Sequence, residues 1–130
     1  MASIFSKIIT GDIPSYKIAE NEYCYAFLDI NPLTEGHTLV VPKKEIDYLF
    51  DVEDPLYAEL FLFSKKIAKA LKEVFKCERV GMAVLGFDVN HAHIHLVPMN
   101  KLSDLDFSKE KLKLNSEQFQ EIATKIINTL

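Results

Sequence analysis

The chain has 130 residues, of which 48% are hydrophobic and 26% are charged, and its formal net charge is −4. Such a chain is long enough for one domain with its own core, and its composition excludes a disordered protein. The acidic balance argues against a nucleic-acid partner. The absence of a secretory signal or of about 18 consecutive apolar residues argues against a membrane partner and favours a cytoplasmic protein.

The N-terminal segment predicts a helical turn and a hairpin. Residues 3–10 mix apolar and polar side chains in a short helical segment, and Pro14 then redirects the chain. Residues 16–19 and 23–28 are rich in aromatic and aliphatic side chains and are separated by the polar turn 20–22. This pattern predicts two antiparallel strands joined as a β-hairpin.

The middle of the chain predicts a strand, a long helix and another strand. Residues 36–42 are mainly β-branched or aliphatic and end at a proline, as a strand would. Residues 54–75 carry apolar side chains at the period of a helix, with Asp51 or Asp54 as the N-cap and lysines on the solvated side. The apolar positions are Leu56, Leu60, Phe63, Ile67, Ala70, Leu71 and Val74. Residues 80–85 then return as a strand.

Residues 90–99 alternate histidine with small or apolar side chains. His91, His93 and His95 are three of the four histidines in the chain. Because successive side chains of a strand point to opposite faces, the three imidazoles are expected on one face and the apolar residues on the other. Burying three imidazoles without partners would be costly. The pattern therefore favours a ligand or a hydrogen-bond network over incidental structural histidines.

The C-terminal segment predicts a charged, irregular stretch followed by a helix. Residues 101–114 show no period, whereas residues 116–130 have an apolar face and begin beside Asn115 and Ser116, either of which can cap a helix. The apolar face consists of Phe119, Ile122, Ala123, Ile126 and Ile127. It is expected to cover either the sheet of its own domain or a partner subunit.

The histidine-rich segment resembles the signature of the histidine triad (HIT) family, His-φ-His-φ-His-φ-φ with φ apolar. Residues 91–97 read His-Ala-His-Ile-His-Leu-Val and match it throughout. Four further segments follow the order and spacing of the family, which makes the resemblance specific over about the first hundred residues. They are Ile-Phe-Ser-Lys-Ile-Ile at 4–9, Ile-Pro at 13–14, Ala-Phe-Leu-Asp-Ile-Asn-Pro at 26–32 and Gly-His-Thr-Leu-Val-Val-Pro-Lys-Lys at 36–44.

The resemblance implies an α+β fold with a five-stranded, mainly antiparallel sheet, the long helix packed on it and a C-terminal helix. Residues 1–130 would form a single HIT domain, with a core at about 3–100 and a C-terminal extension at about 101–130. Members of the family pair two such domains through a continuous sheet, so a homodimer is expected here.

The resemblance also implies a nucleotide pocket. Asp29, at the end of a predicted strand, would accept two hydrogen bonds from the ribose diol, while its position before Asn31 and Pro32 also suits a turn. His37 would lie beside the three histidines and join their hydrogen-bond network through His91. The apolar walls of the base pocket would be Phe5, Ile8, Ile13, Phe27 and Ile30.

The chemistry that the resemblance implies is attack on the α-phosphorus of a nucleotide. Neutral His93 would form a nucleotidyl-imidazole intermediate that water hydrolyses, and a backbone carbonyl would fix its tautomer. His95 would donate to the phosphoryl oxygens, and His91 would hold the network. The implied small-molecule substrates are purine nucleoside phosphoramidates, aminoacyl adenylates and dinucleoside polyphosphates, and no cofactor is expected.

Two alternatives stay open at this point. The His-x-His spacing is also typical of zinc ligands, but only His37 remains to complete such a site. Ser6 stands near the position where some relatives carry a zinc-binding cysteine, so no metal is expected. The second alternative is a nucleotide-sensing module with negligible turnover. It depends on residues 86–90, where Asp88 takes a position that is usually Ser or Thr in the family and would repel a phosphate if it pointed inward.

Overall fold

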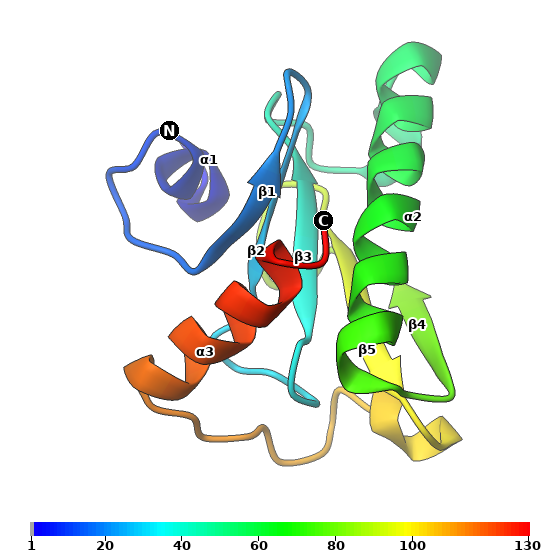
Figure 1. Cartoon of the computed structure of the whole chain (residues 1–130). Coiled ribbons are helices and arrows are strands. Elements are labelled where there is room, and N and C mark those ends of the chain that lie inside the picture. Colours follow the sequence, from blue (N-terminus) through cyan, green and yellow to red (C-terminus); the bar gives the residue numbers. More distant parts are fainter. Residues whose placement is uncertain (1) are drawn as a thin grey trace.

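The computed structural model, which describes residues 2–130, contains a five-stranded sheet with helices on both faces (Figure 1). The strands are β1 (Lys17–Glu20), β2 (Cys24–Leu28), β3 (Thr38–Pro42), β4 (Arg79–Ala83) and β5 (Ile94–Met99). They stand in the order β1-β2-β3-β5-β4, and all four pairings are antiparallel. The α+β fold and the predicted hairpin are therefore confirmed.

The helices are α1 (Ile4–Ile9), α2 (Asp54–Phe75) and α3 (Ser116–Ile127), with short 3-10 turns η1 (Leu49–Asp51) and η2 (Leu102–Leu105). No helix within residues 2–130 has both the length and the apolar character needed to cross a membrane.

The long helix α2 occupies its predicted range, but the prediction of its cap was wrong. Its N-cap is Glu53, whose side chain makes no capping hydrogen bond, rather than Asp51 or Asp54. Pro55 lies in the first turn, where its missing N–H costs nothing and its fixed φ suits a helix. The cap of α3 agrees with the prediction, because the Asn115 side chain accepts a hydrogen bond from the N–H of Gln118.

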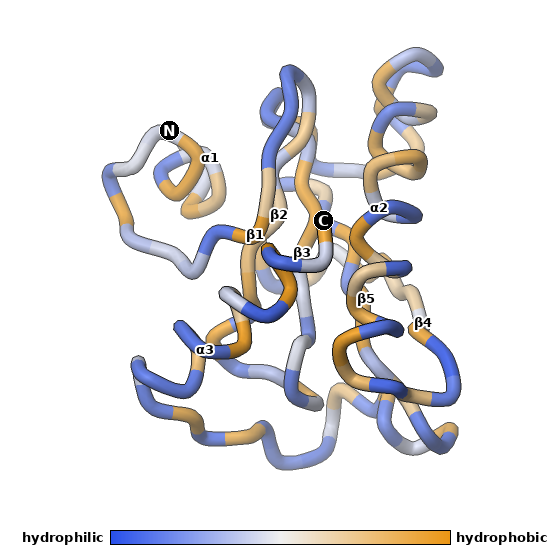
Figure 2. The backbone as a smooth tube through the Cα atoms, in the orientation of Figure 1, coloured by the Kyte–Doolittle hydropathy of each residue, from blue (hydrophilic) through white to orange (hydrophobic). Residues whose placement is uncertain are grey.

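One face of the sheet packs against α2 and α3 and forms the main core. The strand alternation sends Ala26, Val40 and Ile94 to this face, and all three are fully buried. Figure 2 shows hydrophobic residues along the central strands and polar residues on the outer turns of α2.

The predicted apolar face of α3 belongs to the same core except for Ile127, which is exposed near the end of the helix. Phe119 stacks on Tyr16 with ring centroids 4.9 Å apart. The apolar face of α3 was expected to cover either its own sheet or a partner subunit, and it covers its own sheet.

The opposite face carries α1 and the histidines. The register pairs Leu39 of β3 with His95 of β5, so both side chains point away from α2. Phe5 and Ile8 of α1 pack on this face against Phe27 and Leu39. The helix α1 therefore covers part of the face on which His95 lies.

The prediction of one strand from residue 90 to residue 99 was wrong at its beginning. Strand β5 starts at Ile94, so His91 and His93 precede it and only His95 lies within the ladder. The N–H of Ala92 donates to the carbonyl of Ile46, outside the sheet, at 2.7 Å. Alternating side chains predict an extended backbone, but they do not reveal whether a neighbouring strand pairs with it.

Candidate active site

A backbone carbonyl fixes the tautomer of His93, as predicted. Its Nδ1 lies 2.8 Å from the carbonyl oxygen of His91, so we assign the ring proton to Nδ1, which donates it. In the neutral ring, Nε2 then carries a lone pair. This atom is buried and has no hydrogen-bond partner within the described part of the chain. Such a nitrogen is suited to nucleophilic attack.

His37 and His95 form a chain of hydrogen bonds. The N–H of Leu33 donates to His37 Nδ1 at 3.0 Å, so the proton of His37 is on Nε2. This Nε2 lies 2.9 Å from His95 Nδ1 and donates to it. The proton of His95 is therefore on its Nε2, where it is free to donate to an oxygen atom of a ligand.

The prediction that His37 joins the network through His91 was wrong. Because Leu39 lies opposite His95, His37 is a diagonal neighbour of His95 on the same face of the sheet. His91 instead donates from Nε2 to the carbonyl of Pro42 at 2.8 Å. It lies before the paired part of β5 and so reaches the far end of β3.

His91 is also attached to α1. The Ser3 hydroxyl donates to His91 Nδ1 at 2.7 Å and accepts from the N–H of Ser6, which makes Ser3 the N-cap of the helix. Glu45 completes the network, because its Oε1 accepts from the Ser3 N–H at 2.6 Å and from the Ser6 hydroxyl at 2.7 Å. The sequence analysis missed Ser3 and Glu45. Only the Ser-x-x-Ser pattern before an apolar segment indicated a cap.

We expect Glu45→Gln to remove part of the acid sensitivity of folding. The hydrogen bonds from Ser3 and Ser6 lower the pKa of Glu45 from 4.5 to about 2. Because the folded protein binds this proton more weakly than the unfolded chain, the stabilisation is complete above about pH 4.5 and is lost as the pH falls toward 2. Urea unfolding followed across this range should show a shallower decline for Glu45→Gln than for the wild type.

The matched control for this experiment is Glu121→Gln, which changes an exposed carboxylate on α3. It should keep the wild-type pH dependence. Identical pH profiles for Glu45→Gln and the wild type would show that the network does not couple Glu45 to folding.

Burial favours the neutral form of His37, His91 and His95 at pH 7. It lowers the pKa of His37 to about 3 and that of His95 to about 4, and the neighbouring rings lower both further. Burial also lowers the pKa of His91, against the opposing effect of its bond to the Pro42 carbonyl. Neutral rings are what the tautomer assignments require, and a neutral imidazole is the form that can act as a nucleophile.

Asp29 lies beside the histidines and also serves the turn. Its Oδ1 accepts from the N–H of Asn31 at 2.8 Å, and its Oδ2 lies 3.5 Å from His37 Nε2. Burial raises the pKa of Asp29, and the nearby carboxylate of Asp88 raises it further. Because His37 is neutral, the Asp29–His37 contact is not an ion pair, and Oδ2 remains available to a ligand.

Asp29, His37 and His95 also bring their ligand atoms within 4.8 Å of one another, as in a metal site. The hydrogen bonds do not fit this use. The Leu33 N–H places a proton on His37 Nε2, and that proton occupies the lone pair of His95 Nδ1. A cation would have to displace both bonds, so we assign no metal here.

The apolar residues predicted to form a base pocket are mostly brought together. The ring of Phe5 lies 5.5 Å from that of Phe27 and 5.0 Å from that of His93, edge to face in both cases. Ile8 and Ile13 join the same cluster. Ile30 does not, since it is 64% exposed.

Phe107 also contacts the histidines, and the sequence analysis missed it. Its ring lies 4.7 Å from that of His95 and 6.4 Å from that of His37. It belongs to the segment 101–114, where the absence of a period left no signal for a contact with the site.

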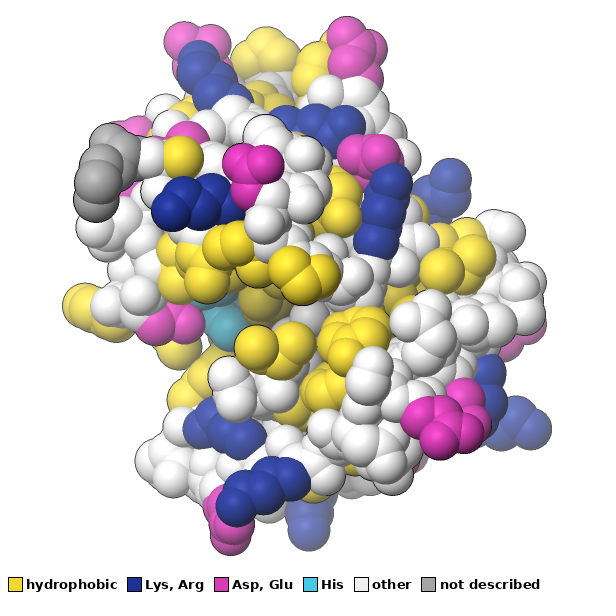
Figure 3. Space-filling model, turned by 90° about the vertical axis from the view of Figure 1, so that its left-hand side faces the viewer, with side chains coloured by type: hydrophobic (Ala, Val, Ile, Leu, Met, Phe, Trp, Pro, Cys, Tyr) yellow, Lys and Arg dark blue, Asp and Glu magenta, His cyan; other side chains and the backbone are white. Residues whose placement is uncertain are grey.

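The carboxylate of Asp88 lies next to Nε2 of His93. Its Oδ1 lies 3.2 Å from His93 Nε2, without the geometry of a hydrogen bond, although the side chain is 68% exposed. The Asp88 side chain therefore points inward, which is the orientation in which it was expected to repel a phosphate. Figure 3 shows a histidine side chain in a hollow, with hydrophobic side chains around it and acidic atoms beside it.

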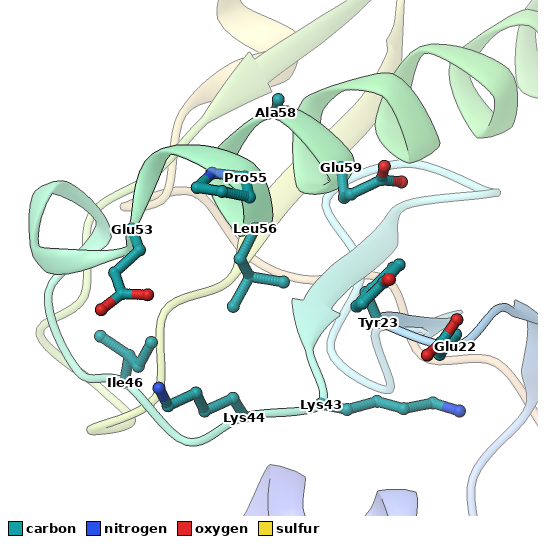
Figure 4. A pocket seen from close by; sticks show the side chains of 10 residues that line it. All are labelled: Glu22, Tyr23, Lys43, Lys44, Ile46, Glu53, Pro55, Leu56, Ala58 and Glu59. Carbon is teal, nitrogen blue, oxygen red and sulfur yellow. The ribbon is translucent and has the colours of Figure 1, made fainter.

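A cavity of about 640 Å³ lies elsewhere, between the β1–β2 turn, the end of β3 and the start of α2 (Figure 4). Tyr23, Lys44 and Glu59 are among its lining residues, and no histidine contributes to it. It therefore does not share the chemistry of the histidine face.

Comparisons with known proteins identify the family of the chain. The sequence model of the family described as HIT domain matches residues 10–102. The chain is 38% identical over 131 residues to an uncharacterized HIT-like protein of Borreliella burgdorferi, covering 95% of this chain and 94% of that protein. It is 40% identical over 98 residues to adenosine 5′-monophosphoramidase HNT1 of Saccharomyces cerevisiae, covering 75% and 62%.

A solved structure extends the agreement to three dimensions. The crystal structure of a HIT-like protein from Bartonella henselae superposes with a TM-score of 0.85 at 32% sequence identity, and the match covers 98% of this chain and 96% of that one. The family match, the relatives and the hydrogen-bonded histidines together show that the chain belongs to the histidine triad family.

Proposed function

We propose that the protein hydrolyses nucleotides at the α-phosphate through a nucleotidyl-histidine intermediate. The observation that carries this proposal is Nε2 of His93, a buried and unbonded ring nitrogen whose lone pair is directed by the His91 carbonyl. Three fungal relatives are named adenosine 5′-monophosphoramidase, which supports nucleoside phosphoramidates as the substrate class.

The reaction would proceed in two displacements. First, His93 Nε2 forms a bond to the α-phosphorus as the bond to the leaving group breaks, and the leaving group departs with the bonding electrons. The Nε2–H of His95 donates to a non-bridging oxygen as negative charge grows there. Water then attacks the phosphorus, the nitrogen–phosphorus bond breaks, and the nucleoside monophosphate and free His93 are released.

The remaining site residues would bind the nucleoside. Asp29 Oδ2 would accept from the ribose diol, since only Oδ1 is used by the turn. Phe5, Ile8, Ile13 and Phe27 would line the base side of the pocket, with Ile30 at its exposed edge. No step in this sequence requires a cofactor.

The test is the release of AMP from adenosine 5′-phosphoramidate, with AMP binding measured by calorimetry on the same sample. Turnover supports the hydrolase. A second candidate, a nucleotide-sensing module, is favoured by the Asp88 carboxylate in front of His93. It would show AMP binding without release, and the absence of both binding and release would refute the nucleotide assignment.

We also propose that two copies pair through the β4 edge of the sheet. Strand β4 has a neighbour on one side only, and exposed apolar side chains lie on and beside it. They are Tyr48, Phe50, Met82, Leu85 and Phe87. We expect light scattering to give a dimer for the wild type and a monomer for Phe87→Glu, because a charge would be buried in the contact. Ile127→Glu, on α3, should remain dimeric, and a monomeric wild type would refute the pairing.

A further inference from the structure

Asp88 is held in its inward position by the loop itself. Its Oδ1 accepts from the N–H of Val89 at 3.1 Å, and the same oxygen lies 3.2 Å from His93 Nε2. Gly86, with φ of +82°, supplies the left-handed turn that begins this loop. Val89 packs on the apolar cluster around Phe5, which anchors the other end. The direction of the carboxylate is therefore built into residues 86–89.

This carboxylate occupies space that the reaction needs. A phosphorus atom bonded to His93 Nε2 would bring its oxygens up against the Asp88 carboxylate, because Oδ1 lies only 3.2 Å from that nitrogen. Because Asp88 is mostly exposed, its side chain can turn outward as substrate enters, while its backbone remains in the loop beside His93 and keeps a negative charge next to the site. Asp29 adds a second carboxylate close enough for the two to influence each other. The site thus disfavours negative charge on its ligand beyond the α-phosphate itself.

We propose that Asp88 is a specificity-determining residue that selects substrates by the charge of the group leaving the α-phosphorus. Neutral and cationic amines would be favoured over phosphates, carboxylate-bearing amines and other anionic leaving groups. The inference rests on the proposed function and narrows it to nucleoside phosphoramidates with uncharged or positively charged amine components. Dinucleoside polyphosphates would be poor substrates, because their leaving group is a polyanion.

The chemistry of the first displacement explains why the negative charge of Asp88 affects the leaving group. As the His93–phosphorus bond forms, the phosphorus–nitrogen bond of the substrate breaks, and the departing nitrogen takes the electron pair and a proton from water. An amine thus leaves without negative charge, whereas a phosphate leaves as an anion. A nearby carboxylate raises the energy of the second transition state relative to the first.

The experiment uses three adenosine 5′-phosphoramidates with the same reacting bond. Their amine components are propylamine, 1,3-diaminopropane and β-alanine, which place no charge, a positive charge or a negative charge near the site at pH 7.5. For the wild type we expect kcat/KM for AMP release to fall from the cationic to the neutral to the anionic compound, by about tenfold at each step. In Asp88→Asn, which keeps the size of the side chain, the three values should agree within about twofold.

Two controls accompany the variant. Glu121→Gln removes one negative charge from α3 and should keep the wild-type order, which separates the local effect from net charge. Asp88→Ser provides a second, smaller replacement and should also remove the charge preference. Circular dichroism should show the wild-type fold for both Asp88 variants, since the side chain is exposed and outside the core.

The outcomes separate the two proposals. Equal kcat/KM values for the three compounds in the wild type, or a charge preference that survives in Asp88→Asn and Asp88→Ser, would overturn the role of Asp88 while the hydrolase stands. No AMP release from any of the three by the wild type would overturn the proposed function and the inference with it. A charge preference that is lost only in the Asp88 variants supports both.

Discussion

Replacing His93 with alanine should abolish the formation of the nucleotidyl intermediate and reduce turnover by at least about 10⁴-fold. The reason is that His93 alone among the three histidines presents a buried lone pair with no hydrogen-bond partner in the part of the chain that the structure describes. His91 uses both ring nitrogens in hydrogen bonds, and the Nδ1 of His95 is occupied by His37. Intact-protein mass spectrometry after brief mixing with adenosine 5′-phosphoramidate should detect the adduct, or an assay should detect rapid AMP release, for the wild type and not for His93→Ala.

His95→Ala is the matched variant for this measurement. It removes a hydrogen-bond donor and leaves the nucleophile, so we expect the adduct to form, with turnover lower by about 10²- to 10³-fold. An adduct retained by His93→Ala would show that another residue attacks the phosphorus. An adduct absent from His95→Ala but present on His93→Ala would reverse the two roles.

Gly36→Ala should destabilise the fold by about 3 kcal/mol, since two penalties coincide at this position. Gly36 is buried and has a backbone φ of +89°, which residues other than glycine rarely adopt. A Cβ atom placed there would also lie 2.7 Å from Cζ of the Phe75 ring, so that ring, at the end of α2, would have to move. Urea or thermal unfolding of the purified variant measures the loss.

Gly11→Ala separates the two penalties. Gly11 has nearly the same φ, +87°, but a Cβ atom there would meet nothing within 4 Å. We expect it to cost only the backbone part, about 1 kcal/mol. Equal losses for the two variants would mean that the contact with Phe75 contributes nothing. Because Gly36 precedes His37, Gly36→Ala should also slow turnover in the fraction that remains folded.

The alternation and periodicity of side chains were enough to predict most elements of the fold. The range 54–75 was predicted correctly for α2 because its buried positions, such as Leu60 and Ile67, recur every helical turn and depend on no distant partner. The hairpin and the Asn115 cap were predictable for the same reason, since their signals lie within a few residues. The N-cap of α2 was not, because Glu53 acts there without the side-chain bond that makes a cap recognisable.

The same contrast between local and long-range signals applies to the candidate site. The three histidines of the candidate site could be picked out from the sequence, because His91, His93 and His95 form a local motif, and the loop before them already drew attention to Asp88. The contacts of these residues became visible in the folded chain alone. They are the pairing of His37 with His95, the hydrogen bonds that connect Ser3 and Glu45 to His91, the packing of Phe107 on His95 and the position of Asp88 beside His93. Most of these contacts join residues that lie tens of positions apart in the sequence. Which residues meet depends on the register of the strands and on how the loops close. Neither leaves a periodic trace in the chain, because register is set by the packing of whole faces rather than by any one residue.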